Sequence, residues 1–217
     1  MKKEIKIVIA DDHPLFRAGL KQTLEAEQNF KVVGEAENGK DAIEMINSKN
    51  PDVALLDIRM PGLNGIEILE KLYEEKTNTK VILLTMYKNE NYFYQAISLG
   101  AKGYILKETA VNELIEAVNI VADSGTFISE ALTHFITAAK KTDEDSQQII
   151  NSINSLTETE KKILHLISQW KTNNEIAEEL FVSPRTVGNH RTHISLKLNL
   201  HGTHSLVRFS IENQDIF

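Results

Sequence analysis

The chain has 217 residues, of which 41% are hydrophobic and 25% charged, and this ordinary globular composition suggests one large domain or two ordinary ones. It contains no cysteine, which excludes disulfides and thiolate metal sites and fits a reducing cytosol. The net charge of −7 argues against nucleic acid as a partner when charge is averaged over the whole chain.

The first residues, MKKEIKIVIADD, combine a basic start with a short apolar run. That run ends at Asp11-Asp12, so it is too short for the core of a signal peptide or for a membrane span. We therefore expect a cytoplasmic protein with no membrane partner.

Apolar, strand-like runs alternate with helix-like stretches through the first half of the chain. The strand-like runs are Lys6–Ala10, Lys31–Ala36, Val53–Ile58, Lys80–Met86 and Gly103–Lys107. The helix-like stretches are Pro14–Glu27, Gly39–Ser48, Gly65–Glu75, Glu90–Leu99 and Val111–Ser124. This alternation predicts an α/β fold, a doubly wound, five-stranded parallel sheet with helices on both faces.

Polar and charged side chains stand at the carboxyl ends of these strands. Asp11 and Asp12 follow the first strand, Asp57 ends the third, Thr85 ends the fourth and Lys107 ends the fifth. In such sheets the ligand crevice lies at these ends, so we expect the side chains to converge on one rim. Crowded carboxylates repel, by about 4 kcal/mol for unit charges ~4 Å apart at an effective dielectric of ~20. A divalent cation with oxygen ligands relieves that repulsion, and Mg²⁺ is the usual one where phosphate is handled.

Such a rim suits an aspartate that attacks a phosphoryl donor. Mg²⁺ and the Lys107 ammonium would hold the charge on the transferred oxygens, and Thr85 would donate a hydrogen bond to the product phosphate. Each residue alone has a structural explanation, Asp57 as a turn residue and Lys107 as a solvated lysine. Their occurrence together at successive strand ends favours the chemical interpretation. His13 is interpreted as a helix-start feature.

The stretches IVIADDHPLFRAGL, DVALLDIRMPGLNGIEIL, VILLTMY and GAKGYILK resemble a response-regulator receiver domain, over about residues 5–124. The resemblance implies a flavodoxin-like sheet in which Asp57 accepts a phosphoryl group from a sensor histidine kinase. It also implies that Mg²⁺ is held by Asp11, Asp12, Asp57 and the Arg59 backbone carbonyl.

The same resemblance implies a pair of switch residues. Thr85 would move toward the phosphate, and Tyr104 would turn inward. Lys107 is followed by Glu108, where many receivers have proline, but the DNA-binding subfamily described below often has an acid at this position.

The pattern changes beyond the last of these helices. A helical stretch begins at Thr126, and KKTDEDSQQ, at Lys140–Gln148, is charged, polar and free of aliphatic residues, which predicts a linker. We therefore expect a receiver domain at 1–124, a helical extension and linker at 125–151, and a second domain at 152–217.

Only helical signals follow this linker. LTETE and TNNE each put a threonine three residues before a glutamate, at Thr157 and Thr172, and both are capping boxes. SPRT offers Ser183 as a further N-cap, with proline at the first helical position. With a fourth candidate at Gly202–Asn213, the sequence predicts an all-α, four-helix domain.

The stretch NEIAEELFVSPRTVGNHRTHISLKL predicts a helix, a turn and a second helix. The apolar face of the pair consists of Ile176, Ala177, Leu180, Val187, Ile194 and Leu198. Arg185, Gly188, Asn189 and Thr192 recur at helical spacing on the opposite stripe. No acid occurs between Pro184 and Asn199, although the chain as a whole has a net negative charge.

A polar helix start without acids suits the major groove of DNA. There Arg185 and Asn189 can read guanine and adenine edges, with Thr192 on the same stripe. The residues that flank this stripe and suit phosphates are Arg191, His193 and Lys197. From charge alone, a second interpretation is as good as DNA binding: a solvated face on a small helical bundle that binds a protein.

The stretches LTETEKKILHLI and TNNEIAEELFVSPRTVGNHRTHISLKL resemble the LuxR-type helix-turn-helix, over about residues 156–211. Joined to a receiver, this resemblance implies a NarL/FixJ-type response regulator that dimerises on a two-fold operator in double-stranded DNA. Two positions depart from the family, which often has glycine in place of Trp170 and lysine in place of Gly188. A glycine in the middle of a helix lowers helix stability by roughly 1 kcal/mol relative to alanine. Glycine in place of lysine also removes a cation that could contact DNA.

These observations predict a phosphorylation-switched transcription regulator that is not a turnover enzyme. One alternative is a Mg²⁺-dependent aspartyl-phosphate hydrolase of the haloacid-dehalogenase type. That chemistry uses a D-x-D pattern after the first strand, whereas Asp11 and Asp12 are adjacent. A second alternative keeps the receiver but gives it a protein-binding output.

Overall fold

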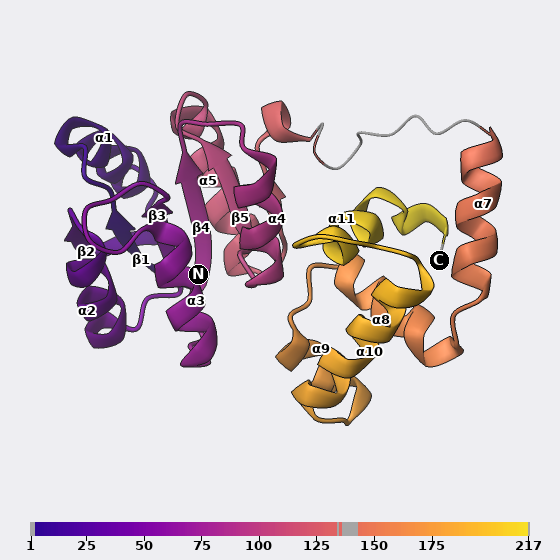
Figure 1. The fold of residues 1–217 in the computed structure, drawn as a ribbon. Helices are drawn as coiled ribbons and strands as arrows, with labels where there is room; N and C mark the ends of the chain where they lie inside the picture. Colours follow the sequence, from indigo (N-terminus) through magenta and orange to yellow (C-terminus); the bar gives the residue numbers. More distant parts are fainter. Residues whose placement is uncertain (1–2, 134, 136–142, 217) are drawn as a thin grey trace. The chain divides into compact units, whose positions relative to one another are not determined.

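Two compact units make up the chain, Met1–Leu132 and Thr133–Phe217 (Figure 1). The computed structural model describes residues 3–133, 135 and 143–216. Residues 140–142 of the predicted linker lie outside this described part.

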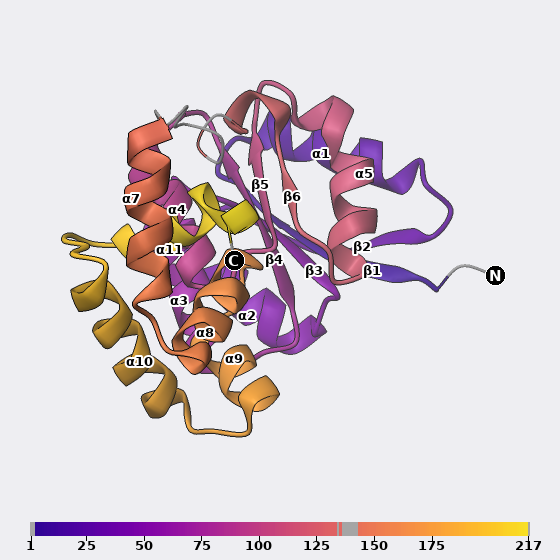
Figure 2. The same cartoon turned by 90° about the vertical axis from the view of Figure 1, so that its right-hand side faces the viewer.

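The first unit is a parallel sheet between two layers of helices (Figure 2). Its strands are β1 (Ile5–Ala10), β2 (Phe30–Ala36), β3 (Val53–Asp57), β4 (Lys80–Thr85), β5 (Gly103–Leu106) and β6 (Phe127–Ile128). Its helices are α1 (Pro14–Glu25), α2 (Gly39–Lys49), α3 (Gly65–Glu74), α4 (Glu90–Ser98) and α5 (Ala110–Ala122), followed by the 3₁₀ turn η1 (Glu130–Leu132). The α/β prediction is confirmed, and the ends of the predicted elements differ from these by one or two residues.

The strand order places the ends of β1 and β3 side by side. The order is β2-β1-β3-β4-β5-β6, and every neighbouring pair is parallel. Because the chain leaves β1 toward one edge and returns toward the other, the ligand crevice of such a sheet lies between β1 and β3. Helices α1 and α5 pack on one face through residues such as Leu20 and Leu114, while α2, α3 and α4 cover the other (Figure 2).

The prediction of five strands is wrong by one, because β6 adds a short sixth strand at the edge. Phe127 donates its backbone N–H to the carbonyl of Lys102 at 2.9 Å, and Ser129 donates to that of Tyr104 at 3.0 Å. Phe127 and Ile128 are good strand formers, but a run of two residues gives no periodic signal. The prediction of a helical stretch from Thr126 is therefore wrong at its start, where Phe127 and Ile128 form the edge strand of the sheet.

The prediction of a linker is also corrected, because helix α7 (Asp143–Asn154) begins inside it. Near the end of α7, Ile153 is 3% exposed, so this helix contributes to the core of the second unit. An aliphatic-free stretch can thus be the first turns of a helix rather than a linker.

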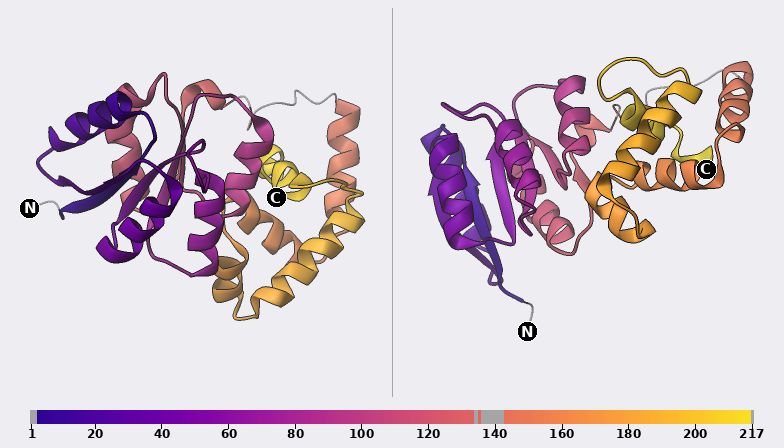
Figure 3. Two further views of the ribbon diagram at one scale, coloured as in Figure 1. Left: turned by 60° about the vertical axis from the view of Figure 1, so that its left-hand side comes forward. Right: turned by 60° about the horizontal axis from the view of Figure 1, so that its bottom comes forward.

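The second unit is all-α in its described part, and the four helices predicted for 152–217 are confirmed, with α7 preceding them (Figure 3). After α7 come α8 (Glu158–Ser168), α9 (Asn173–Leu180), α10 (Pro184–Lys197), α11 (Ser205–Glu212) and the 3₁₀ turn η2 (Gln214–Ile216). Both capping boxes are confirmed, and Ser183 caps α10 by accepting from the Thr186 N–H at 3.1 Å. Of the predicted apolar face, Ile176, Val187 and Ile194 are fully buried, whereas Leu180 and Leu198 are only half-buried.

Trp170 occupies the left-handed backbone position that ends α8. Its φ is 65°, its N–H donates to the Ile167 carbonyl at 2.9 Å, and the Lys171 N–H donates to the Leu166 carbonyl at 3.2 Å. This pair of hydrogen bonds is a Schellman motif, in which glycine is the favoured residue. The geometry fits the sequence expectation of glycine here, and the indole that takes its place is buried.

Candidate functional site

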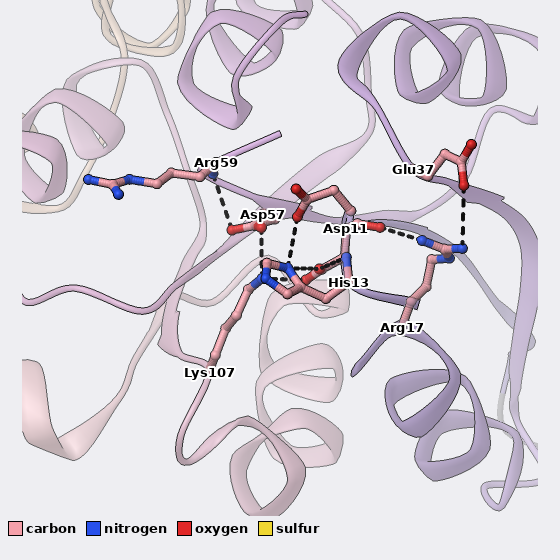
Figure 4. Close-up of polar contacts among 8 residues, drawn as sticks. Asp11, His13, Arg17, Glu37, Asp57, Arg59 and Lys107 are labelled. Atoms are coloured by element: carbon pink, nitrogen blue, oxygen red, sulfur yellow. Dashed lines mark hydrogen bonds and ion pairs between the residues drawn. The ribbon is translucent and has the colours of Figure 1, made fainter. Parts of the chain in front are cut away.

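The site lies where β1, β3 and β5 end, and a lysine bridges two carboxylates there (Figure 4). The Lys107 Nζ lies 2.7 Å from Asp57 Oδ2 and 2.7 Å from Asp11 Oδ2. All three side chains are buried. A buried charge is tolerated when it is paired, and the single ammonium pairs both acids.

A backbone N–H binds the second oxygen of the Asp57 carboxylate, the one that does not face Lys107. The Arg59 N–H donates to Asp57 Oδ1 at 3.2 Å, directly before the Pro61-Gly62 break. Burial raises the pKa of Asp57, and the hydrogen bond from Lys107 works against that rise. The carboxylate therefore sits in a partly dehydrated position, where an ionised oxygen is a better nucleophile than it is in water.

Asp11, Asp12 and Asp57, together with His13, each offer a ligand atom, and these atoms all lie within 4.8 Å of one another. Asp11 Oδ2 and Asp12 Oδ1 are buried, and their neighbours among the described residues are the Lys107 Nζ at 2.7 Å and the His13 Nδ1 at 2.8 Å. Three carboxylates against one ammonium leave a charge of −2 when all are ionised. Oxygen donors with unfilled acceptor positions and this charge fit a divalent cation such as Mg²⁺.

The sequence interpretation missed the side chain of His13. It is the N-cap residue of α1, but its side chain makes no capping bond. Its Nδ1 lies instead 2.8 Å from Asp12 Oδ1 and 3.2 Å from Asp11 Oδ1. The available signal was its position directly after two acids, which brings its ring within reach of both.

A cleft of about 350 Å³ opens beside the acids, with Asp12, Arg59, Asn64 and Tyr92 in its lining. The Arg59 guanidinium points away from Asp57 (Figure 4) and lies 4.2 Å from the centre of the Tyr87 ring. The lining of the cleft includes Asp12 of the acidic cluster and Ile58 and Arg59, the two residues that follow Asp57.

The two predicted switch residues, Thr85 on β4 and Tyr104 on β5, are both buried. Thr85 is buried; its Oγ1 accepts from the Tyr87 N–H at 3.1 Å and donates to the Tyr87 carbonyl at 3.2 Å. Tyr104 is fully buried, and its hydroxyl has no hydrogen-bond partner among the described residues. Burial raises the pKa of Tyr104, and its ring packs edge-on against Phe93 with centres 5.4 Å apart. In this structure the ring is already inward, while the Thr85 hydroxyl is engaged with the backbone of Tyr87.

In the second unit, the predicted reading stripe lies on the exposed side of α10. Arg185, Asn189 and Thr192 are exposed, as is His193 beside them. An added Cβ at Gly188 would meet no atom within 4 Å, so this position also faces open space.

Two of the predicted phosphate contacts have partners inside the domain. The Arg191 Nη1 donates to Asn173 Oδ1 at 2.9 Å, which joins α10 to α9. The Lys197 Nζ donates to Glu160 Oε2 at 2.7 Å, which joins α10 to the capping box of α8. Burial raises the pKa of Glu160, but the hydrogen bonds from Lys197 and Thr157 outweigh it and bring the pKa to about 2.

Two protein families match the chain. "Response regulator receiver domain" matches residues 7–119, and "Bacterial regulatory proteins, luxR family" matches residues 154–210. The chain is 36% identical to the transcriptional regulatory protein DegU of Brevibacillus brevis, over 98% of this chain and 95% of that protein. It is 37% identical to the oxygen regulatory protein NreC of Staphylococcus carnosus, over 97% of this chain and 98% of that protein.

A solved structure resembles the receiver half. It is a DNA-binding response regulator of the LuxR family from Staphylococcus aureus, 35% identical, with a TM-score of 0.53. The match covers 54% of this chain and 98% of that chain.

The first unit is a parallel sheet whose Asp57 lies among further acids and a lysine, and a LuxR-type helix-turn-helix follows it. Together these features define a two-component response regulator with a DNA-binding output. The chain belongs to the NarL/FixJ family of these regulators. Members of this family are transcription factors rather than turnover enzymes, so the hydrolase alternative is wrong, as is the protein-binding output. None of the helices in the described part of the chain has the length and apolar character that a membrane crossing requires.

Proposed function

We propose that a sensor histidine kinase phosphorylates Asp57 and that the phosphate strengthens DNA binding by the second unit. The observation that carries the proposal is the position of the Asp57 carboxylate, paired with Lys107 at 2.7 Å and within 4.8 Å of two further acids. No other described cluster of at least three acidic or histidine side chains offers comparable cation ligands.

The transfer makes a bond between an Asp57 oxygen and phosphorus while the P–N bond of the kinase phosphohistidine breaks. The product is an acyl phosphate, and the departing imidazole takes a proton from solvent. The Lys107 ammonium, already beside Asp57, holds negative charge on the transferred oxygens. Asp11, Asp12, Asp57 and the Arg59 carbonyl would hold Mg²⁺, which would supply further positive charge at this site.

The proposed switch uses Thr85 and Tyr104. The Thr85 hydroxyl would exchange its bonds to Tyr87 for a bond to the phosphate, which gives the phosphorylated state a contact that the free state lacks. The buried Tyr104 hydroxyl makes no hydrogen bond of good geometry within the described residues, although Thr85 is near enough to lower its pKa. A buried polar group in this state needs an explanation, and a second position of the ring supplies one.

For DNA, the proposal assigns base contacts to Arg185, Asn189 and Thr192. Their exposure at the start of α10 supports it, because this part of a recognition helix enters the major groove. His193 remains the exposed phosphate contact beside them. Arg191 and Lys197 have partners in the domain, so we assign to both the additional task of fixing the angle of α10. Homodimerisation on a two-fold operator, in the cytoplasm, completes the proposal.

Labelling with a small phosphodonor such as acetyl phosphate tests the site directly. With Mg²⁺ we expect one phosphate per chain, located at Asp57 by mass spectrometry. Asp57→Ala should remove the label, and Asp12→Ala should abolish the Mg²⁺-dependent part because the cation loses a charged ligand. Glu70→Ala, which removes an exposed acid on α3, is the control and should label normally. Full labelling of Asp57→Ala would refute the assignment.

A further inference from the structure

Arg17, on the first turns of α1, donates to a backbone carbonyl at the centre of the site (Figure 4). Its Nη1 lies 2.5 Å from the Asp11 oxygen. The same guanidinium approaches two acids at and after the end of β2, with Nε 3.7 Å from Glu35 Oε2 and Nη2 4.0 Å from Glu37 Oε2. Its side chain is only 16% exposed, so these contacts are made largely out of water.

The other polar groups of Asp11 are also fixed. Its N–H donates to the Ala36 carbonyl at 3.1 Å, its Oδ1 accepts from the His13 N–H at 2.9 Å, and its Oδ2 faces Lys107. The carbonyl that Arg17 binds belongs to the peptide group that joins Asp11 to Asp12. Because a peptide group is planar, fixing its oxygen fixes the plane from which the two neighbouring side chains project.

We propose that Arg17 is a positioning residue for the cation site, because it holds the peptide plane between two of its ligands. The inference rests on the proposed function, in which Asp11 and Asp12 bind Mg²⁺. Residues that orient metal ligands through hydrogen bonds typically contribute roughly 10- to 100-fold to metal affinity.

A purely structural role for Arg17 makes a different prediction. Lys21, one turn further along α1, forms an ion pair with the same Glu35, Nζ to Oε1 at 2.6 Å, and has no contact with Asp11. If the ion pairs from α1 to β2 were all that mattered, losing Lys21 would affect the site as losing Arg17 does. Lys21→Met is therefore the matched control for Arg17→Met.

An effect of charge alone predicts that Arg17→Met raises the affinity for Mg²⁺, whereas loss of positioning lowers it. Removing a cation near an acidic site strengthens the binding of another cation, so Arg17→Met would bind Mg²⁺ more tightly on electrostatic grounds. If positioning dominates, the same variant binds Mg²⁺ more weakly. The direction of the change therefore separates the two explanations.

The test is calorimetric titration of Mg²⁺ into the unphosphorylated full chain. We expect Arg17→Met to weaken binding by roughly tenfold, and Lys21→Met to leave it unchanged or slightly tighter. Arg17→Lys keeps the charge and the stem but loses the fork that contacts a carbonyl and an acid together, so it should also weaken binding. In labelling by acetyl phosphate, the Mg²⁺ concentration for half-maximal rate should rise by the same factor, while the rate at saturating Mg²⁺ stays within about twofold.

Wild-type affinity in a folded Arg17→Met or Arg17→Lys chain would overturn the inference, and so would an equal loss in Lys21→Met. Circular dichroism establishes that each variant is folded. If the wild-type chain itself binds no Mg²⁺, the proposed cation site fails as well, and this outcome is distinct from a failure of the role of Arg17 alone.

Discussion

Lys107 shows how one residue sets the charge of the site. Its ammonium lies between Asp11 and Asp57 at 2.7 Å from each, so it neutralises one of the three negative charges that the acids carry when ionised. The sequence located all four groups through strand ends, because parallel strands carry their ends to one rim. It could not predict that Lys107 would bridge two acids, since this depends on side-chain rotamers rather than on the chain pattern.

Thr85→Ala tests the proposed switch residue directly. The variant keeps Asp57, Lys107 and the acids, so we expect phosphorylation at close to the normal extent. The phosphate then lacks its differential contact, and the gain in DNA affinity should be lost, because a ligand shifts an equilibrium only through such contacts. Titration of DNA with labelled protein measures this, and a full gain in Thr85→Ala would mean that the switch lies elsewhere.

Gly188→Ala tests the departure from the family in α10. An added Cβ meets open space, so the substitution should stabilise the second unit by about 1 kcal/mol through helix propensity. The single tryptophan, Trp170, lies in this unit, and its fluorescence reports unfolding in denaturant. Gly202→Ala is the control of opposite sign, because Gly202 has a φ of +99° and should lose about 1 kcal/mol. A neutral Gly188→Ala would contradict this account.

Among the elements, the helices of the second unit are tied together by two cross-links that the sequence pattern does not reveal. Arg191 bonds to Asn173 across the α9–α10 turn, and Lys197 bonds to Glu160 of α8. Glu160 serves its capping box and the ion pair at once, so its pKa is held at about 2. The pair connects the start of α8 to the end of the recognition helix.

Lys197→Met should lower the stability of the second unit at pH 7 by about 1–2 kcal/mol, the contribution of a hydrogen bond to a charged group reduced for partial exposure. The folded-state pKa of Glu160 lies below its ordinary value of 4.5, so the pair stabilises the fold above that pH. Its contribution fades as the pH falls from about 4.5 toward 2, and the difference between variant and wild type should shrink over that window.

Trp170 fluorescence in denaturant, measured at several pH values, checks this prediction. Lys161→Met removes a more exposed ion pair with Glu158 on α8 and should cost less than about 0.5 kcal/mol. A pH-independent loss in Lys197→Met would refute the role given to Glu160.

Some elements of the fold could be predicted from short-range sequence signals, and others could not. Capping boxes, N-caps and the alternating strands were predicted because their signals lie within a few residues. Strand β6 was missed because two residues carry no period. Its position depends on distant bonds, such as the Ser129 Oγ that accepts from the Leu106 N–H at 3.0 Å. The predicted domain ends, 1–124, 125–151 and 152–217, stay predictions, although the first compact unit extends to Leu132.

In the whole molecule, we propose that phosphate on Asp57 increases the affinity of α10 for DNA. The measurement is the dissociation constant of the full chain for a duplex selected from a random pool at low salt, with and without acetyl phosphate and Mg²⁺. We predict a gain on the order of tenfold, as for a typical coupling between two sites, and no gain in Asp57→Ala. Equal affinities for labelled and unlabelled wild type, or an equal gain in Asp57→Ala, would contradict the account.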